Sequence, residues 1–231
     1  MRWNQNIIIV DPQVVLVPYR HEHVAKYHEW MTSPELQELT ASEPLTLEQE
    51  YEMQRKWRED EDKLTFIILA NGPPAPLQPA PEAAPKSEPD VHWLRKLPMV
   101  GDVNLFLKGD PSDEDFEAEV EIMVAEPAYR RRGLAYTVLQ LFLSSVTASS
   151  TSPLHPSPSS ASPARLPPIP RTRLVARIGA QNAPSIALFA KLGFVETRRV
   201  EVFGEVEMRW RDSGRGAWKC GEVREVRFAD D

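Results

Sequence analysis

The residues best suited to chemistry lie in the run Arg130-Arg131-Arg132-Gly133-Leu134-Ala135. Apolar residues recur at helical spacing from Leu134 to Phe142, so a helix is predicted to begin within this run. The first backbone N–H groups of that helix lack intrahelical partners and, together with the helix dipole, favour an anion. The glycine and the alanine let a phosphate group approach the backbone. The run therefore predicts a phosphate-binding site, although a basic helix start on a solvated surface has the same composition.

Two carboxylates precede this run on a predicted strand. Over residues 119–124 apolar residues alternate with Glu119, Glu121 and Met123, which is typical of a strand with one buried face. Glu121, and after it Glu119, are candidates for a general base that accepts a proton directly or through a water molecule. Carboxylates on the solvated face of a strand also keep it soluble, so both explanations stay open.

A further strand and helix follow this unit. Residues 173–178 predict a strand, and Asn182 then precedes Pro184, a proline at a first helical turn. Ile186 and Phe189 lie on the apolar face of the predicted helix. The side chain of Asn182 is placed either to cap this helix or to bind a ligand.

The rest of the chain supplies the elements that must hold these residues in place. The predicted strands cover residues 14–19, 63–69, 99–107, 194–200 and 202–210, and the predicted helices cover 23–30, a turn from Pro34, and 46–57. Strands 63–69 and 99–107 are expected to form a hairpin with a long tip. This order predicts an α/β fold with a mixed sheet.

Two segments have a different composition. Proline, serine, alanine and glutamate dominate residues 72–98, and serine and proline dominate residues 144–170. We therefore expect one domain over residues 1–210 with insertions at about 72–98 and 144–170, and a tail over 211–231 without a strong period. The second insertion is either a tolerated loop, which we favour, or a regulated arm with Ser-Pro sites.

Composition excludes several classes of protein. The chain has 231 residues, 42% of them hydrophobic, and a net charge of −7, which argues against a general nucleic-acid binder. The apolar run 7–10 is too short for a signal peptide or a membrane span, and Cys220 has no cysteine partner. The histidines are scattered without the spacing of a metal site, so we expect no metal. These features predict a protein of the cytoplasm or nucleus, and we expect a monomer.

The chain resembles the GNAT N-acetyltransferases in two motifs. The spacing Arg130-x-x-Gly133-x-Ala135 resembles the pyrophosphate loop of that family, and Asn182 with the run ending in Lys191-x-Gly193-Phe194 resembles its second signature. The phrases Tyr27-His-Glu-Trp-Met31, Ala41-Ser-Glu-Pro-Leu-Thr-Leu-Glu-Gln-Glu-Tyr51, Gly101-Asp-Val-Asn-Leu-Phe-Leu107 and Ala125-Glu-Pro127 are similar to the N-acetyltransferase 9-like branch. Together the similarity covers about residues 1–210, apart from the two low-complexity segments.

This resemblance implies a fold, a reaction and a cofactor. The fold would be a twisted, mostly antiparallel sheet that is splayed in a V and flanked by helices. The reaction would transfer an acetyl group from acetyl-coenzyme A, as co-substrate, to a protein N-terminal α-amino group, with α- and β-tubulin as the implied substrates. A tubulin substrate would place the protein in the cytoplasm, with an association with microtubules.

The resemblance also implies roles for individual residues. Arg131, Arg132, Gly133, Leu134 and Ala135 would hold the pyrophosphate with their backbone, and Arg130 would supply charge. Met123, Val124 and Ala125 would run beside pantetheine, Asn182 would bond to it, and Phe189 would be a further cofactor-binding position.

One departure from the family pattern concerns the general acid. Many GNAT enzymes have a tyrosine seven residues after the signature asparagine, where this chain has Phe189. Water, Tyr136 or no acid at all would then serve, because a thiolate with a pKa near ~8.5 is a fair leaving group. Two functions stay open: an active N-terminal acetyltransferase, which we favour, and an inactive scaffold that binds tubulin. A P-loop nucleotide site is excluded, because no Gly-Lys-Ser/Thr follows the loop.

Overall fold

The computed structural model describes residues 2–72, 91–148, 168–212, 214 and 217–228. The strands are β1 (Ile7–Val10), β2 (Val14–Pro18), β3 (Lys63–Ala70), β4 (Met99–Lys108), β5 (Glu117–Val124), β6 (Leu174–Gly179), β7 (Phe194–Val200), β8 (Glu205–Trp210) and β9 (Glu222–Glu225). The α-helices are α1 (Val24–Met31), α2 (Pro34–Thr40), α3 (Leu47–Glu59), α4 (Leu134–Thr147) and α5 (Ala183–Lys191). The 3-10 helices are η1 (Arg2–Asn4), η2 (His21–His23), η3 (Val91–Lys96), η4 (Pro127–Tyr129), η5 (Arg171–Arg173) and η6 (Glu201–Phe203).

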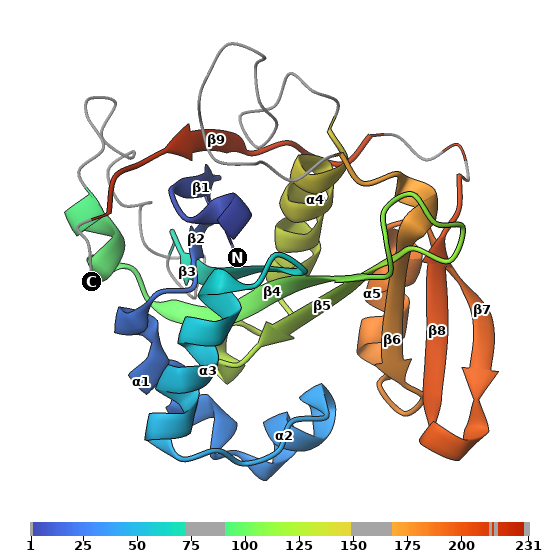
Figure 1. The fold of residues 1–231 in the computed structure, drawn as a ribbon, viewed down its shortest axis with the longest axis horizontal. Helices are drawn as coiled ribbons and strands as arrows, with labels where there is room; N and C mark the ends of the chain where they lie inside the picture. The colour runs from blue at the N-terminus through green and yellow to red at the C-terminus, as the bar shows by residue number, and fades with distance from the viewer. Residues whose placement is uncertain (1, 73–90, 149–167, 213, 215–216, 229–231) are drawn as a thin grey trace.

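The strands form one sheet in the order β7-β8-β6-β5-β4-β3-β2-β1-β9 (Figure 1). Neighbouring strands are antiparallel except β5 and β6, which are parallel. This arrangement confirms the predicted mixed, mostly antiparallel sheet and the hairpin of β3 and β4.

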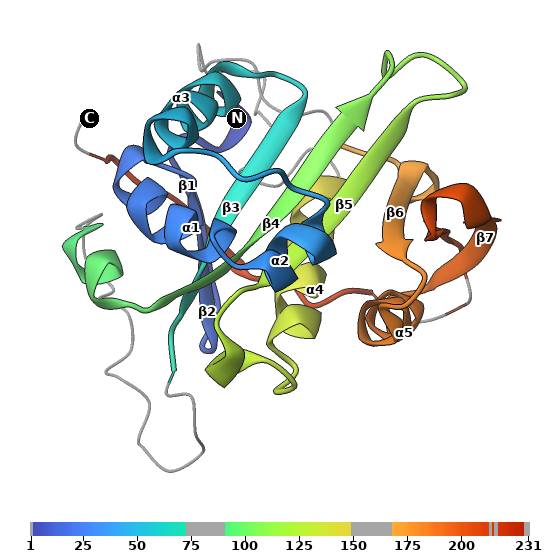
Figure 2. The ribbon, with the colours of Figure 1, turned by 90° about the horizontal axis from the view of Figure 1, so that it is seen from below.

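Helices cover both faces of the sheet, and each face has its own core. One core contains Phe66 and Val120 from the sheet with Phe142 from α4 and Phe189 from α5. The other core contains Ile67 and Met123 with residues of α1 and α2. Figure 2 shows α1, α2 and α3 together over the half of the sheet that contains β1 to β5. Successive residues of a strand point to opposite faces, so the alternating pattern in the sequence feeds both cores.

Local signals in the sequence set where the helices begin. Thr46 caps α3, because its hydroxyl group accepts a hydrogen bond from the N–H of Gln49 and the side chain of Gln49 accepts one from the N–H of Thr46. Pro34 stands in the first turn of α2, as predicted. Gly204 adopts φ of +62° between β7 and β8, as expected of a glycine at a turn.

The expected boundaries of both low-complexity segments were too wide. In the first, residues 91–96 form η3, and Leu94 is buried in the core beneath α1. In the second, α4 continues to Thr147, and Ile169 is buried and donates a backbone hydrogen bond to Val146. Apolar side chains at the ends of both segments are buried in the core, although the average composition of each segment is that of an exposed loop. Residues 73–90 and 149–167, the remainder of both predictions, lie outside the described residues.

The tail, which carries no strong period in the sequence, contains a strand. Strand β9 pairs antiparallel with β1, from Ile7 opposite Glu225 to Val10 opposite Glu222. Strand β1 itself had been noted only as a short apolar run. Trp218, in the same tail, is buried and donates a hydrogen bond from its indole N–H to the carbonyl oxygen of Leu192. The domain therefore extends past residue 210.

Among the described residues, no helix combines the length and the apolar character needed to cross a membrane.

Candidate active site

The central feature of the site is the divergence of β5 and β6. These parallel strands pair only at Ala118 with Leu174 and at Glu119 with Val175. Beyond these two pairs they separate, as the ribbons in Figure 2 show. The second half of β5 therefore presents a backbone edge without a neighbouring strand. The structure thus contains the V that the resemblance implied.

The predicted phosphate-binding run lies where α4 begins, just after the end of β5. Gly133 is the N-cap of α4 with φ of +79°, and Arg131 also has a positive φ of +63°. The N–H groups of Leu134, Ala135 and Tyr136 receive no cap from a side chain, and no described residue accepts a hydrogen bond from them. A side chain added at Gly133 would meet nothing within 4 Å, so the space in front of these N–H groups is open. We call this opening, formed by residues 131–136, the anion cradle.

The arginines at the cradle have different surroundings. Arg131 and Arg132 are exposed, so their charges raise the local positive potential. The Arg130 guanidinium instead donates hydrogen bonds to the carbonyl oxygens of Val124 and Ala125, at 2.8 and 3.0 Å, and contacts Glu35 of α2 at 2.9 Å. Arg130 therefore holds the end of β5 against α2, and its charge reaches the cradle only from a distance.

The three residues expected beside pantetheine lie at this end of β5. Met123 and Ala125 are buried in the core under α1, whereas Val124 is half-buried. Only the backbone of Met123 and Ala125 is therefore available to a ligand in the V.

Asn182 caps α5, because its side-chain oxygen accepts a hydrogen bond from the N–H of Ser185 at 3.2 Å. The side-chain amide nitrogen has no hydrogen bond to a described residue and remains available as a donor. The cap and the ligand contact, which the sequence left as alternatives, are therefore compatible.

Phe189 belongs to the core and not to an open wall of the V. Its side chain is 2% exposed and packs edge-to-face against Phe194, with ring centroids 5.1 Å apart. The expected contact of Phe189 with the cofactor stays a prediction, and the side chain leaves almost no exposed surface for it. The tyrosine suggested as a substitute acid, Tyr136, lies in the first turn of α4, where its hydroxyl group accepts a 3.4 Å hydrogen bond from Gln140.

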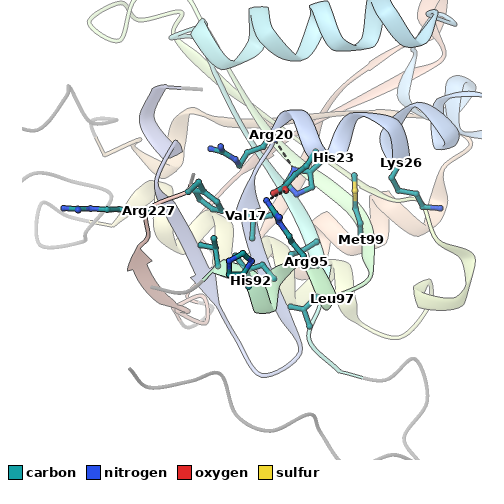
Figure 3. A pocket seen from close by; sticks show the side chains of 14 residues that line it. Val17, Arg20, His23, Lys26, His92, Arg95, Leu97, Met99 and Arg227 are labelled. Atoms are coloured by element: carbon teal, nitrogen blue, oxygen red, sulfur yellow. Dashed lines mark hydrogen bonds and ion pairs between the residues drawn. The ribbon is translucent and has the colours of Figure 1, made fainter. Parts of the chain in front are cut away.

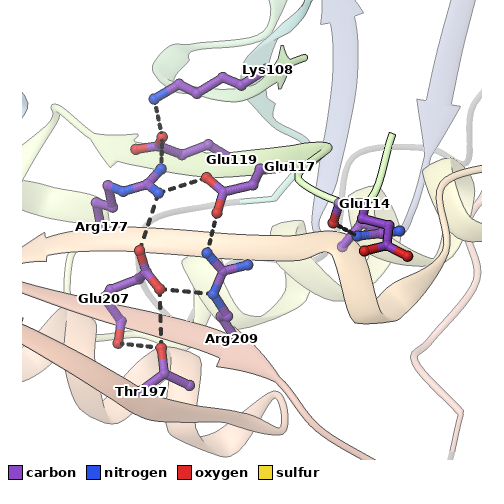
Figure 4. A network of polar contacts seen from close by, with 9 residues as sticks. Lys108, Glu114, Glu117, Glu119, Arg177, Thr197, Glu207 and Arg209 are labelled. Carbon is purple, nitrogen blue, oxygen red and sulfur yellow. Dashed lines mark hydrogen bonds and ion pairs between the residues drawn. The ribbon is translucent and has the colours of Figure 1, made fainter. Parts of the chain in front are cut away.

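The two candidate bases differ sharply in their surroundings. Glu119 is 5% exposed and forms ion pairs with Lys108 and Arg177, which continue through Glu117 toward β8 (Figure 4). Both cations contact Oε2 of Glu119, and their positive charges favour the ionised carboxylate over the protonated form. Glu121 is exposed and makes no hydrogen bond or ion pair with any described residue. Of the two carboxylates, Glu121 is thus the better placed to accept a proton from a ligand.

The protein surroundings also favour Glu121 as a base. Part of the Glu121 side chain is exposed, but desolvation by the surrounding protein raises the pKa of its carboxyl group to about 7, and the negative charges of Glu119 and Asp102 contribute to this rise. A carboxylate with a pKa near neutrality is a far stronger base than an ordinary glutamate.

A buried polar group behind Glu121 escaped the sequence analysis. Asp102 and Asn104 of β4 are 1% and 6% exposed and share a face of the sheet with Glu121. The carboxylate of Asp102 accepts hydrogen bonds from Asn104 and from Tyr27 of α1. The available signal was two polar residues at alternate positions between the apolar residues of a strand.

A separate pocket of about 510 Å³ lies between η2, η3 and residues 227–228 (Figure 3). Cationic side chains, including Arg20 and Arg95, line it above apolar residues such as Val17 and Leu69. This pocket is not lined by any residue predicted for the phosphate loop or as the general base. We therefore do not assign the pocket to the predicted acetyl-transfer site. The described residues also contain no group of three or more histidine, cysteine, aspartate or glutamate side chains placed to hold a metal ion.

The residues present fit coenzyme A. The anion cradle offers unpaired N–H groups at the positive end of a helix dipole, which suits a diphosphate. The unpaired edge of β5 offers backbone groups of the kind that an amide-containing chain such as pantetheine can pair with. The fold and the site together define a transferase that binds an acyl thioester in a divided sheet.

Comparison with known proteins agrees with this class. A family model described as an acetyltransferase (GNAT) domain matches residues 13–195, and the chain belongs to this family. It is an acetyl-coenzyme A-dependent N-acetyltransferase.

Relatives of known name cover most of the chain. A protein of Drosophila melanogaster named alpha/beta-tubulin-N-acetyltransferase 9 is 41% identical over 208 residues, or 90% of this chain and 88% of the relative. The mouse protein of the same name is 44% identical over 90% of this chain and 73% of its own length. An N-acetyltransferase 9-like protein of Schizosaccharomyces pombe is 37% identical over 90% of this chain and 97% of its own length.

Solved structures share the fold at low sequence identity. Spermidine N-acetyltransferase from Vibrio cholerae, in complex with CoA and spermine, superposes with a TM-score of 0.59 at 15% identity. The match covers 86% of this chain and 94% of that one. A GNAT-family acetyltransferase from Bacillus anthracis gives a TM-score of 0.56 at 12% identity, over 87% and 96% of the two chains.

Proposed function

We propose that this enzyme acetylates the N-terminal α-amino group of α- and β-tubulin. The names of the fruit-fly and mouse relatives, which align with 90% of the chain, support tubulin as the acceptor. We further propose that the protein acts in the cytoplasm in association with microtubules, and that it does so as a monomer.

The choice of an α-amine as the acceptor depends on Glu121, which is unpaired among the described residues and has a raised pKa. A peptide α-amino group has a pKa of ~7.7–8.0, whereas a lysine side chain has one of ~10.4. A base with a pKa of about 7 can deprotonate the first with little difficulty but is poorly matched to the second. The single unpaired carboxylate of β5 thus suits an N-terminal substrate.

The proposed mechanism assigns one task to each part of the site. Acetyl-coenzyme A supplies the acetyl group as a thioester. The N–H groups of Leu134, Ala135 and Tyr136 bind the diphosphate, and the edge of β5 positions the reacting group in the V. Glu121 accepts the proton of the amine as the N–C bond forms and the C–S bond breaks. The electron pair leaves with sulfur, and no phenol at position 189 is available to protonate it.

The direct test is acetylation of peptides by the purified chain. Incubation with acetyl-coenzyme A and peptides that carry the N-terminal sequences of α- and β-tubulin should release one free thiol for each acetyl group gained at the α-amine. Mass spectrometry of fragments locates the modification. Acetylation of an internal lysine alone would replace the proposal with a lysine acetyltransferase.

The role of Glu121 is tested by its pH dependence. Glu121→Gln should slow acetylation by at least about 100-fold below pH 7, and the loss should shrink as rising pH deprotonates the amine in solution. The matched control is Glu119→Gln, which should keep most of the rate below pH 7 because Lys108 and Arg177 engage that carboxylate, while the loss of its charge should move the acidic limb of the profile to lower pH. Calorimetry should show equal coenzyme A affinity in both variants. If Glu121→Gln follows the parent profile, the base lies elsewhere, and the loop at Ser42 and Glu43 is the next place to examine.

A second function, a scaffold that binds tubulin without turnover, is favoured by one observation. Phe189 is sealed in the core, so the position where many GNAT enzymes place an acidic phenol holds none. The peptide assay separates the two functions: a scaffold would bind tubulin and coenzyme A but release no thiol.

A further inference from the structure

The polar group behind Glu121 is a continuous chain of hydrogen bonds inside the sheet. The Thr65 hydroxyl donates to Asn104 Oδ1 at 2.7 Å, and Asn104 Nδ2 donates to Asp102 Oδ2 at 2.8 Å. The Tyr27 hydroxyl donates to the same oxygen at 3.4 Å. The chain thus joins β3, β4 and α1 and fixes the orientation of the Asp102 carboxyl group.

The second oxygen of Asp102 has no partner. Asp102 Oδ1 is buried and accepts no hydrogen bond within the part of the chain that the structure describes. Burial of a carboxylate is costly even when it is fully hydrogen-bonded, and an unpaired oxygen adds to that cost. An asparagine or an apolar residue would fill this buried position at a lower free-energy cost than an aspartate. The charge of Asp102 therefore calls for a functional explanation.

The position of Asp102 relates it to Glu121. In the antiparallel pair of β4 and β5, Glu121 lies opposite Asn104, and Asp102 lies opposite Met123. Asp102 and Glu121 are therefore diagonal neighbours on one face, at a spacing of roughly 7–8 Å between Cα atoms. Asn104, which holds Asp102, is the cross-strand partner of Glu121.

Other ionisable groups also face this part of the sheet, from every neighbouring element. They are Tyr19 just after β2, Tyr27 of α1, Glu50 of α3, Lys63 of β3, Lys108 of β4 and Glu119 of β5. Glu119 also raises the pKa of Glu121, but it is paired with Lys108 and Arg177, whereas Asp102 has no cationic partner among the described residues. Asp102 is thus the buried negative charge next to Glu121 that no cation balances.

We propose that Asp102 is a positioning residue for acetyl transfer, whose buried and uncompensated carboxylate makes Glu121 an effective base. This inference rests on the proposed role of Glu121 and extends it to a residue that does not touch the substrate. Asn104 and Tyr27 serve the same purpose by holding Asp102 in place.

The direction of the effect follows from the charges. Burial raises the pKa of Asp102 to about 6, although hydrogen bonds from Asn104 and Tyr27 oppose that rise. Asp102 is therefore ionised at neutral pH, where its negative charge disfavours ionisation of Glu121 and raises the pKa of that group. Without the charge Glu121 would release its proton at lower pH and would be a weaker base.

The test uses Asp102→Asn, which keeps the shape of the side chain and removes the charge. Glutamate residues labelled with 13C at the carboxyl carbon report each titration by NMR, and the signal of Glu121 is assigned by its absence in Glu121→Gln. The titration midpoint of Glu121 should fall by about one pH unit in Asp102→Asn. The acidic limb of the pH–rate profile should move in the same direction, with a several-fold lower rate at its plateau.

The matched control is Glu50→Gln, which neutralises another carboxylate that is 1% exposed on the same side of the sheet and is not among the main charges that shift the pKa of Glu121. It should leave the Glu121 midpoint in place. An unchanged midpoint in Asp102→Asn, or an equal shift in both variants, would overturn the inference. If Asp102→Asn does not fold, Tyr27→Phe is the alternative variant. Loss of the hydrogen bond from Tyr27 raises the pKa of Asp102, so Asp102 carries less charge when Glu121 titrates. The titration midpoint of Glu121 should then fall slightly.

The titration also separates this inference from the proposed function. A shifted midpoint together with an unchanged rate in Glu121→Gln would retain the coupling of the two carboxyl groups and refute Glu121 as the base. A slow Glu121→Gln variant together with an unshifted midpoint would retain the base and refute the role of Asp102.

Discussion

The V has two arms, one formed by β1 to β5 and the other by β6, β8 and β7. The two arms differ in the contacts that stabilise them. Strands β1 to β5 have helices or helical turns over both faces, and every residue of β3 from Leu64 to Ala70 is buried. Strands β6, β8 and β7 pack on α5 with one face, whereas β7 is exposed along most of its length. The exposed face of this second arm contains the ion-pair network of Arg177 and Arg209. Apolar burial holds the first arm on both faces, whereas in the second arm apolar burial holds one face and charged contacts hold the other.

This difference suits a site that must open between the arms. The first arm provides the rigid half, with Glu121 and the buried chain of Asp102 fixed in a double-sided core. The second arm joins it by two backbone pairings, by ion pairs from Arg177 to Glu117 and Glu119, and by the core that both arms share on the α4 and α5 face. Charged contacts tolerate small changes of angle better than close-packed side chains do. We therefore expect substitutions in the two arms to have different consequences.

The largest effect is expected in the first arm. Phe66 is fully buried and packs edge-to-face against Phe142 of α4, with ring centroids 6.1 Å apart. Phe66→Ala should lower the free energy of unfolding by about 3–5 kcal/mol, because it removes buried area and leaves a cavity. Urea unfolding followed by fluorescence measures this change. Val195→Ala in β7, where the side chain is 43% exposed, is the control and should cost less than about 0.5 kcal/mol. Similar losses for both would refute the contrast between the arms.

The next effect concerns the anion cradle at the junction of the arms. Gly133→Glu places a side chain and a negative charge in front of the N–H groups that we expect to bind diphosphate, and should weaken coenzyme A binding by at least about 100-fold. Isothermal calorimetry measures the affinity.

The control for this change is Gly204→Glu. Gly204 has a similar positive φ of +62° and equally open space, but it lies at the turn between β7 and β8. The backbone strain is therefore matched, and coenzyme A affinity should be retained. If a folded Gly133→Glu variant binds coenzyme A as tightly as the parent, the anion cradle is not the diphosphate-binding site.

The smallest of the three effects is expected in the second arm. Arg177→Met should lower the free energy of unfolding by about 1–3 kcal/mol at pH 7, because Glu117, Glu119 and Glu207 lose a shared cation. Burial raises the pKa of Glu117, but hydrogen bonds from Arg177 and Arg209 lower it by more and hold it below the usual value. This stabilisation is present above the unfolded-state pKa of ~4.3 and is lost as pH falls through the folded-state value.

The gap between parent and Arg177→Met should therefore narrow when unfolding is repeated near pH 4. Arg199→Met, which removes an exposed pair with Glu196, is the matched control and should change the stability by about 0.5 kcal/mol or less. A loss that does not depend on pH would assign Arg177 a packing role instead of an electrostatic one.

The features that the sequence predicted are those with local causes. Alternation over residues 119–124, the caps at Thr46 and Asn182, and the glycine at the start of α4 each depend on neighbours within a few residues. They sufficed to predict the strand, the helices and the anion cradle. The expectation that Phe189 lies on an apolar helix face was confirmed, whereas its expected contact with the cofactor was not.

The features that the sequence could not predict depend on distant partners. Glu119 and Glu121 look alike in the sequence, and only the positions of Lys108 and Arg177 distinguish them. Arg177 is 58 residues away from Glu119 along the chain. Asp102 is likewise defined by Tyr27, 75 residues away. Strand β9 has only four residues, three of them charged, so its pairing with β1 comes from tertiary structure and not from propensity.

The pairing of β1 with β9 has a consequence for biosynthesis. Strand β1 is a run of four buried aliphatic residues, yet its outer edge stays unpaired until residues 222–225 have been made and have left the ribosome. An exposed apolar edge of this kind pairs readily with other chains. The nascent protein therefore carries an aggregation-prone strand for most of its synthesis, and a chaperone bound near Ile7–Val10 would protect it until the sheet is complete.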